Sequence, residues 1–332
     1  MRSVIFSVLF SLTGLPLASL AADEVVVYSA RKEHLIKPLF EAFEKDTGIQ
    51  VKYITDKAGP LLQRLKAEGK RSPADMLMTV DAGNLWHAAE TGVLAPTQSD
   101  ILERAVPAYL KDPQNRWFGI TVRARTIVYN KDRVEPEELS TYEALADEKW
   151  KGRLCLRTSK KVYNQSLVAM MISRHGEQQA AEIVSGWVNN LALPPFSNDT
   201  KTMQAVSSGQ CDIAIVNTYY FGRLEKKDPQ INLALFWPNQ RSSGVHVNVS
   251  GAGITQHAKH KKEARQLLEW LVSDKAQSML AGLNMEYPVN SNVAIPSQVK
   301  NWGVFKADDI NLSEAGRLQS SAVKLMDKSG YR

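Results

Sequence analysis

The sequence predicts an α/β fold of two lobes, each with a mixed sheet flanked by helices, joined by crossing strands that form a hinge. Short apolar strands alternate with helices of about 10 to 15 residues, as in βαβ units. The same order occurs twice: a helix, a glycine that ends it, and an apolar strand that begins at an aspartate. The two aspartates are Asp75 and Asp212. The 332 residues suffice for two domains, yet no Pro-, Ser- or Gly-rich linker separates the halves.

The first half of the chain begins with a strand at residues 24–28 and a helix at residues 33–46. Leu35 and Phe43 fall on one apolar face of this helix, and Gly48 follows its end as a stop signal. The other elements predicted for this half are strands at 49–54 and 74–80 and helices at 60–68 and 84–90.

The second half repeats the alternation of strands and helices. Its predicted elements are a strand at 151–156, a helix at 164–175, a helix from Asn198 or Asp199 to 208, and a strand at 212–216. Beyond Ile254 the chain is mostly helical, with helices predicted at 260–273, 275–281 and 313–327.

Two extended, β-rich stretches at residues 117–129 and 245–254 interrupt this order. In a two-lobed binding protein such stretches cross between the lobes, and the ligand lies in the cleft at the carboxyl ends of the strands. Independent domains on a flexible linker are the alternative, which the missing linker disfavours. We therefore expect lobe 1 to comprise residues 23–122 plus about 248–298, and lobe 2 to comprise residues 123–247 plus about 299–332.

The amino terminus has the pattern of a secretory signal peptide. Arg2 is the only charge before Asp23, and an apolar core is followed by a break and a run of small residues. We predict a signal peptide at residues 1–21, with cleavage after Ala22 as the alternative. A membrane anchor needs about 20 apolar residues, and a glycine and a proline interrupt this stretch. The mature chain is therefore expected to be exported and soluble.

The net charge of the chain and the distribution of its basic residues indicate what kind of ligand it binds. The formal net charge is +6 and falls to about +5 once Arg2 is removed. The basic residues are spread along the chain, apart from Lys259-His-Lys-Lys262, so they form no stripe for nucleic acid. An anion or an anionic metal complex is the more natural partner.

Cys155 and Cys211 are the only cysteines. In an oxidising compartment an isolated pair indicates a disulfide. It would close a loop of about 56 residues and stabilise the fold by roughly 4 kcal/mol. A metal dithiolate, the rival interpretation, would need further Cys or His at short spacing, which the sequence lacks.

Catalytic motifs are missing from the sequence. It contains no Gly-x-Ser-x-Gly, no His-Glu-x-x-His, no phosphate-binding P-loop and no dinucleotide glycine fingerprint, and its six histidines are scattered. An exported hydrolase or transferase would also need a nucleophile–base pair, so we expect the protein not to be an enzyme.

The tyrosines carry more information. Tyr219 and Tyr220 directly follow the apolar strand and Asn217-Thr218, which can cap a helix. At a helix start, adjacent residues lie about 100° apart, so both phenols can border one cleft. Tyr163 occupies the same kind of strand-to-helix junction, and a helix N-terminus favours negative charge. Packing, or a stacking platform, is the structural alternative for the tyrosine pair.

Several segments resemble the periplasmic ferric-iron-binding proteins of iron ABC importers. The most specific is Tyr163-Asn-Gln-Ser166, followed by Asn217-Thr-Tyr-Tyr220, with 56 residues from Tyr163 to Tyr219. The other similar segments are residues 27–31, 72–75 with 79–81, 122–125 with 128–130, and 150–153.

The resemblance implies a type II periplasmic-binding-protein fold and Tyr163, Tyr219 and Tyr220 as ligands of Fe³⁺. It also implies that Arg31 and Arg123 hold a synergistic anion such as carbonate. The disulfide resembles one found in part of the family. A monomer in the periplasm that delivers iron to an inner-membrane ABC permease is the implied setting.

The resemblance has one departure. Several family members place a His or Tyr just after the first strand as a further ligand, whereas this chain has Arg31-Lys-Glu-His34. Glu33 and His34 are therefore optional ligands, and the expected set is three tyrosines plus an anion or water.

The proposed ligands also make chemical sense. Fe³⁺ is a small, hard cation that prefers anionic oxygen, and three phenolates would neutralise its charge. Ionising three free tyrosines at pH 7 costs roughly 12 kcal/mol, which a highly charged metal can offset. The alternative keeps the fold and changes the cargo to an oxyanion or small organic anion held by Arg31 and Arg123 without metal.

Overall fold

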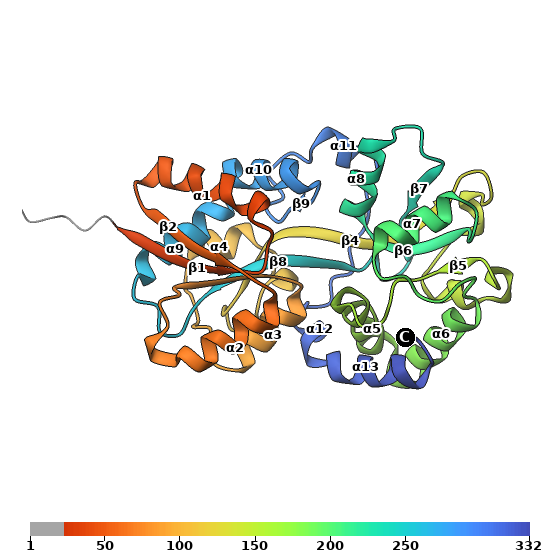
Figure 1. Cartoon of the computed structure of the whole chain (residues 1–332), viewed down its shortest axis with the longest axis horizontal. Helices are drawn as coiled ribbons and strands as arrows, with labels where there is room; N and C mark the ends of the chain where they lie inside the picture. The colour runs from red at the N-terminus through yellow and green to blue at the C-terminus, as the bar shows by residue number, and fades with distance from the viewer. Residues whose placement is uncertain (1–22) are drawn as a thin grey trace, which may run out of the picture.

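The computed structural model describes residues 23–332, which form two lobes lying side by side (Figure 1). The predicted signal peptide lies outside these residues. Strands follow the order β2-β1-β3-β8-β4-β6-β5, with β7 and β9 also paired to β4. Their bounds are β1 Glu24–Ser29, β2 Gln50–Thr55, β3 Met76–Val80, β4 Phe118–Asn130, β5 Leu154–Cys155, β6 Ile213–Asn217, β7 Leu233–Phe236, β8 Val247–Ile254 and β9 Tyr287–Pro288.

Lobe 1 is built on the parallel strands β2, β1 and β3, and β8, which lies between β3 and β4, runs antiparallel to β3. The first helix buries Leu35, Leu39 and Phe43 and ends at Gly48, which adopts a left-handed φ of 76°. The helices near this sheet are α1 Glu33–Thr47, α2 Ala58–Glu68, α3 Ala82–Glu90, α4 Asp100–Ala105, α9 Lys261–Leu271 and α10 Asp274–Asn284.

Lobe 2 is built on β5 and β6, which are parallel, and on the second half of β4, which is antiparallel to β6. Its helices and the carboxyl-terminal ones are α5 Val162–His175, α6 Glu177–Asn189, α7 Asp199–Ser207, α8 Thr218–Lys227, α11 Ser297–Lys300, α12 Ser313–Arg317 and α13 Gln319–Lys328. Short 3-10 helices occupy Gly69–Arg71, Ala108–Leu110, Pro136–Glu138, Glu143–Ala146 and Glu148–Trp150.

The strands β4 and β8 cross between the lobes, as the sequence predicted (Figure 1). The first half of β4 pairs with β8, and its second half, from Arg125 onward, pairs with β6. Every residue of β4 is buried. Helix α12 packs against α3 of lobe 1 and α5 of lobe 2, so it also links the lobes.

Two expectations about elements were wrong in detail. The strand predicted at 151–156 shrinks to β5, because the chain turns at Gly152, where φ is 69°. The helix predicted at 313–327 divides into α12 and α13 at Leu318. The predicted mixed sheets are confirmed, because β4 and β8 run antiparallel to their neighbours whereas β1, β2 and β3 are parallel.

The predicted disulfide between Cys155 and Cys211 is confirmed, and it joins β5 to the residues just before β6. Within residues 23–332 no helix is long and apolar enough to cross a membrane.

Candidate functional site

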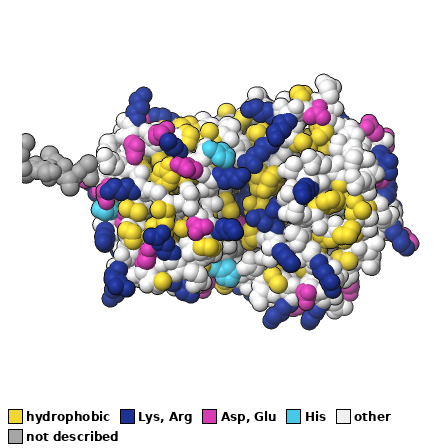
Figure 2. Space-filling view, viewed as in Figure 1, with side chains coloured by type: hydrophobic (Ala, Val, Ile, Leu, Met, Phe, Trp, Pro, Cys, Tyr) yellow, Lys and Arg dark blue, Asp and Glu magenta, His cyan; other side chains and the backbone are white. Residues whose placement is uncertain are grey.

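A cavity of about 260 Å³ lies between the lobes and receives side chains from both. Lys and Arg side chains gather where the lobes meet (Figure 2). The lining includes three phenols, five basic side chains and one carboxylate, contributed by Tyr163, Tyr219, Tyr220, Arg31, Lys32, Arg123, Lys161, Arg223 and Glu286. The cavity is therefore suited to negative charge.

The three tyrosines come from the first turns of two helices. Tyr163 is the second residue of α5, and Tyr219 and Tyr220 are the second and third residues of α8. Tyr163 and Tyr219 are buried, and the rings of Tyr219 and Tyr220 lie 4.4 Å apart at 37°. The structure therefore brings the three sequence-predicted tyrosines together at helix N-termini, where partial positive charge favours anions.

Basic side chains surround these rings. The Nζ atom of Lys161 lies 4.6 Å from the ring centre of Tyr163, and the guanidinium of Arg123 lies 5.5 Å from it. The guanidinium of Arg223 lies 5.2 Å from the ring of Tyr219 and 5.8 Å from that of Tyr220. These cations would stabilise phenolates more than neutral phenols.

The phenols are nevertheless hard to ionise without a metal. Burial raises the pKa of Tyr163, although Arg123 opposes the rise. Burial also raises the pKa of Tyr219 well above the usual value, with Tyr163 and Tyr220 adding to the effect. Only a strongly charged cation bound between them would favour the deprotonated forms.

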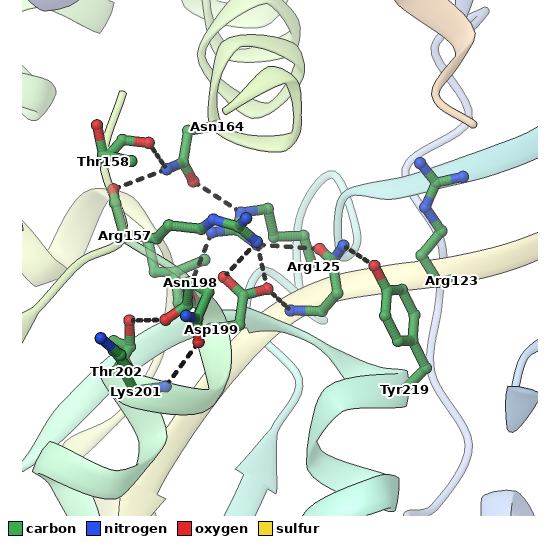
Figure 3. A network of polar contacts seen from close by, with 12 residues as sticks. Arg123, Arg125, Arg157, Thr158, Asn164, Asn198, Asp199, Lys201, Thr202 and Tyr219 are labelled. Atoms are coloured by element: carbon green, nitrogen blue, oxygen red, sulfur yellow. Dashed lines mark hydrogen bonds and ion pairs between the residues drawn. The ribbon is translucent and has the colours of Figure 1, made fainter. Parts of the chain in front are cut away.

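A buried polar network lies beside Tyr219 (Figure 3). At its centre Arg125 donates to Asn164 (2.9 Å), Asp199 (3.2 Å) and Asn217 (2.9 Å). Asn217 in turn donates to the hydroxyl of Tyr219 (3.3 Å). The network therefore ties both tyrosine-bearing helix starts to strand β4.

Asn217 differs from its predicted role. We expected Asn217-Thr218 to cap the helix, but the side chain of Asn217 makes no cap hydrogen bond. Its oxygen accepts from Arg125 and its amide nitrogen donates to Tyr219 instead. The demand of the buried guanidinium for acceptors explains the difference.

Arg31 and Arg123 both line the cavity, but their surroundings differ. Arg31 donates to Glu286 (2.8 Å) and to Thr121 (3.1 Å). Burial by itself would raise the pKa of Glu286, but Arg31 outweighs it and the pKa is lowered. Both terminal nitrogens of Arg123 are buried without a hydrogen-bond partner among residues 23–332. Arg123 therefore has free donors for an anion, whereas Arg31 is already paired.

The optional first-lobe ligands Glu33 and His34 do not line the cavity. Glu33 begins α1, and its carboxylate accepts a hydrogen bond from Tyr53 at 3.0 Å. His34 is exposed on the same helix. Within the described part of the chain, no three His, Cys, Asp or Glu side chains are grouped as a metal site.

Sequence reasoning missed several residues of the site. Arg125 could have been found, because two arginines spaced by two in a largely apolar strand point to the same face of that strand. Glu286 and Asp81 gave no such signal, since each meets its arginine only through the fold. Lys161 and Arg223 lie close in sequence to the predicted tyrosine ligands but were not predicted to line the site.

The fold and the site together define a class of protein. Two lobes, crossing strands and an interlobe cavity are the features of a solute-binding protein that encloses its ligand. Residues 38–307 match the family model of the bacterial extracellular solute-binding proteins, and the chain belongs to this family.

The most informative relatives are named for iron. Iron uptake protein A1 of Synechocystis is 46% identical over 316 residues, which cover 93% of this chain and 88% of that protein. The major ferric iron-binding protein of Neisseria gonorrhoeae is 26% identical, with 96% of each chain covered.

Solved structures give the same result. A Trichodesmium protein named IdiA or FutA, in complex with iron and citrate ligands, has a TM-score of 0.90 and 44% identity, covering 93% of this chain and 100% of its own. The ferric binding protein from Campylobacter jejuni has a TM-score of 0.86 and 35% identity, covering 93% and 100%. The predicted type II periplasmic-binding-protein fold is confirmed.

Proposed function

We propose that this protein binds ferric iron in the interlobe cavity through Tyr163, Tyr219 and Tyr220, and that an anion beside Arg123 completes the coordination. The observation that carries the proposal is the convergence of three phenols on one cavity lined by cations. The names of the relatives, iron uptake protein and ferric iron-binding protein, support the choice of metal.

The charge of the cavity supports an accompanying anion. Three phenolates balance Fe³⁺, and Glu286 balances Arg31, which leaves Lys32, Arg123, Lys161 and Arg223 without a carboxylate in the lining. The resemblance to the ferric-iron-binding proteins implies an anion such as carbonate. Citrate, which accompanies iron in the Trichodesmium structure, is a larger candidate of the same chemistry.

The proposed setting is transport. Membership of an extracellular solute-binding family supports a location in the periplasm, after removal of residues 1–21. There the protein would close on its cargo as a monomer and deliver it to an inner-membrane ABC permease. Its role is that of a binding protein rather than an enzyme.

The test is iron loading of the purified mature protein with Fe³⁺ and bicarbonate. Phenolate coordination should give a red-orange charge-transfer band, and Tyr219→Phe should weaken the band and reduce the affinity by about tenfold or more. Tyr129→Phe is the control, because Tyr129 lies on β4 and does not line the cavity. A colourless protein without tight Fe³⁺ binding would contradict the proposal.

The second candidate function is binding of an oxyanion or small organic anion without metal. The excess of basic side chains around the cavity favours it. Calorimetric titration with phosphate or sulfate separates the two candidates. Tight anion binding that persists after Tyr→Phe changes at all three positions would support the second one.

A further inference from the structure

Asp81 is a buried carboxylate at the boundary between the lobes. It is 0% exposed and precedes α3, and it adopts a φ of 79°, where residues other than glycine are rarely found. A strained backbone of this kind persists only where its surroundings enforce it, and it points to a function.

The contacts of Asp81 join three parts of the molecule. Its Oδ1 atom accepts from the backbone nitrogen of Gly83 (2.9 Å) and from the hydroxyl of Ser166 (2.7 Å). Its Oδ2 atom accepts from Asn248 (3.0 Å). Ser166 belongs to α5 of lobe 2 and Asn248 to the crossing strand β8. The carboxylate is therefore held in place by both lobes.

This fixed carboxylate faces Arg123. The Oδ2 atom of Asp81 lies 3.7 Å from Nη2 of Arg123, close enough for an ion pair and too far for a hydrogen bond. Both terminal nitrogens of Arg123 lack a hydrogen-bond partner among the described residues, and the side chain is almost fully buried. Arg123 thus has a neighbouring negative charge while its donors stay available.

We propose that Asp81 is a built-in counter-charge to Arg123, and that it sets how strongly the cavity holds an external anion together with the iron. The inference rests on the proposed function. An anion that approaches Arg123 is attracted by the guanidinium and repelled by the carboxylate beside it, and the low-dielectric interior strengthens both effects. In the wild-type protein, a small anion such as bicarbonate should therefore bind beside Arg123 only weakly when iron is present.

The test compares the bicarbonate dependence of the charge-transfer band in CO₂-free buffer for wild type, Asp81→Asn and Asp112→Asn. Asn keeps the capping ability and tolerates the left-handed backbone. Asp112 is an equally buried carboxylate of lobe 1 that pairs with Arg116 at 2.7 Å and does not line the cavity. Circular dichroism and thermal unfolding check that each variant is folded.

Asp81→Asn should lower the bicarbonate concentration at half-saturation by about tenfold or more, because the repulsive charge is gone. Asp112→Asn should leave that concentration within about twofold of wild type. An Asp81→Asn variant that needs the same bicarbonate concentration as wild type overturns the inference. Absence of the band in the wild type would instead contradict the proposed function.

Removing one partner of a buried pair can prevent folding, so a second variant covers that case. The double variant Asp81→Asn, Arg123→Gln removes both charges together. It should load Fe³⁺ without responding to bicarbonate, and it should bind iron less tightly than Arg123→Gln alone, in which the unpaired carboxylate of Asp81 attracts the cation. Equal iron affinity of the double and single variants overturns the inference.

Discussion

At the residue scale, two opposing influences act on the pKa of Tyr219. Burial raises the pKa of its phenol, with Tyr163 and Tyr220 adding to the effect, while the positive charge of Arg123 lowers it. Without metal the protonated form prevails. The proton is therefore part of the binding equilibrium, because a phenolate ligand forms only when its proton leaves.

Iron affinity should consequently fall as the pH falls. If three phenols ionise on binding, the logarithm of the association constant should change by about three per pH unit below their pKa values. Tyr219→Phe removes one of these protons, so its slope should be about one unit smaller. Competition with one chelator across pH 5.5 to about 8 measures both slopes under the same conditions. Identical slopes would show that Tyr219 does not bind as a phenolate.

At the element scale, the position of α8 depends on a close contact with the chain after α10. A Cβ atom on Gly222 would lie 2.6 Å from the Trp302 ring and 2.7 Å from the sulfur of Met285. The Trp302 indole nitrogen also donates to Glu225 of α8 at 3.0 Å. Tyr219 and Tyr220 lie on the first turn of this helix, so the contact sets their position.

Gly222→Ala should therefore displace α8, destabilise the protein by roughly 1–3 kcal/mol and lower its iron affinity. Gly282→Ala is the matched control, because Gly282 also lies in a helix but has open space around it. Gly282→Ala should stabilise the protein slightly, because alanine has a higher helix propensity than glycine. Urea unfolding and iron titration measure the two effects. Unchanged iron affinity in a destabilised Gly222→Ala variant would show that the contact only supports the fold.

At the same scale, the sequence predicted most of what depends on neighbouring residues. The strand starts, the glycine stops and the placement of Tyr163 and Tyr219 at helix starts follow from local patterns of apolar and polar residues. The pairs Arg31–Glu286 and Arg123–Asp81 could not be predicted, because 255 positions separate the first pair and each pair forms only in the folded chain. Glu33 and His34 were plausible by spacing alone, yet neither lines the cavity.

At the scale of the whole molecule, a buried histidine couples stability to pH. His246 precedes β8 and is almost fully buried, and burial lowers its pKa to about 3, with Arg125 and Arg123 adding to the effect. In the unfolded chain its pKa would be about 6.5. Between these two values the unfolded state binds the extra proton, so the stability contributed by neutral His246 is lost as the pH falls from about 6.5 toward about 3.

His246→Gln should therefore flatten the decline in unfolding free energy on acidification, by up to about 5 kcal/mol between neutral and strongly acid pH. His257→Gln changes an exposed histidine and should keep the wild-type slope. Urea denaturation of the metal-free protein at a series of pH values gives the three curves. Parallel curves for wild type and His246→Gln would assign the acid sensitivity to other groups.

The crossing of β8 also has a consequence for the order in which the chain folds. β3 has β1 on one side and β8 on the other, and Thr255 just after β8 donates to Ala74, 181 positions earlier. As the chain is made from its amino end, lobe 1 lacks the strand beside β3 until after lobe 2's β6 and α8 have been synthesised. The part of the protein made first is thus among the last to be completed.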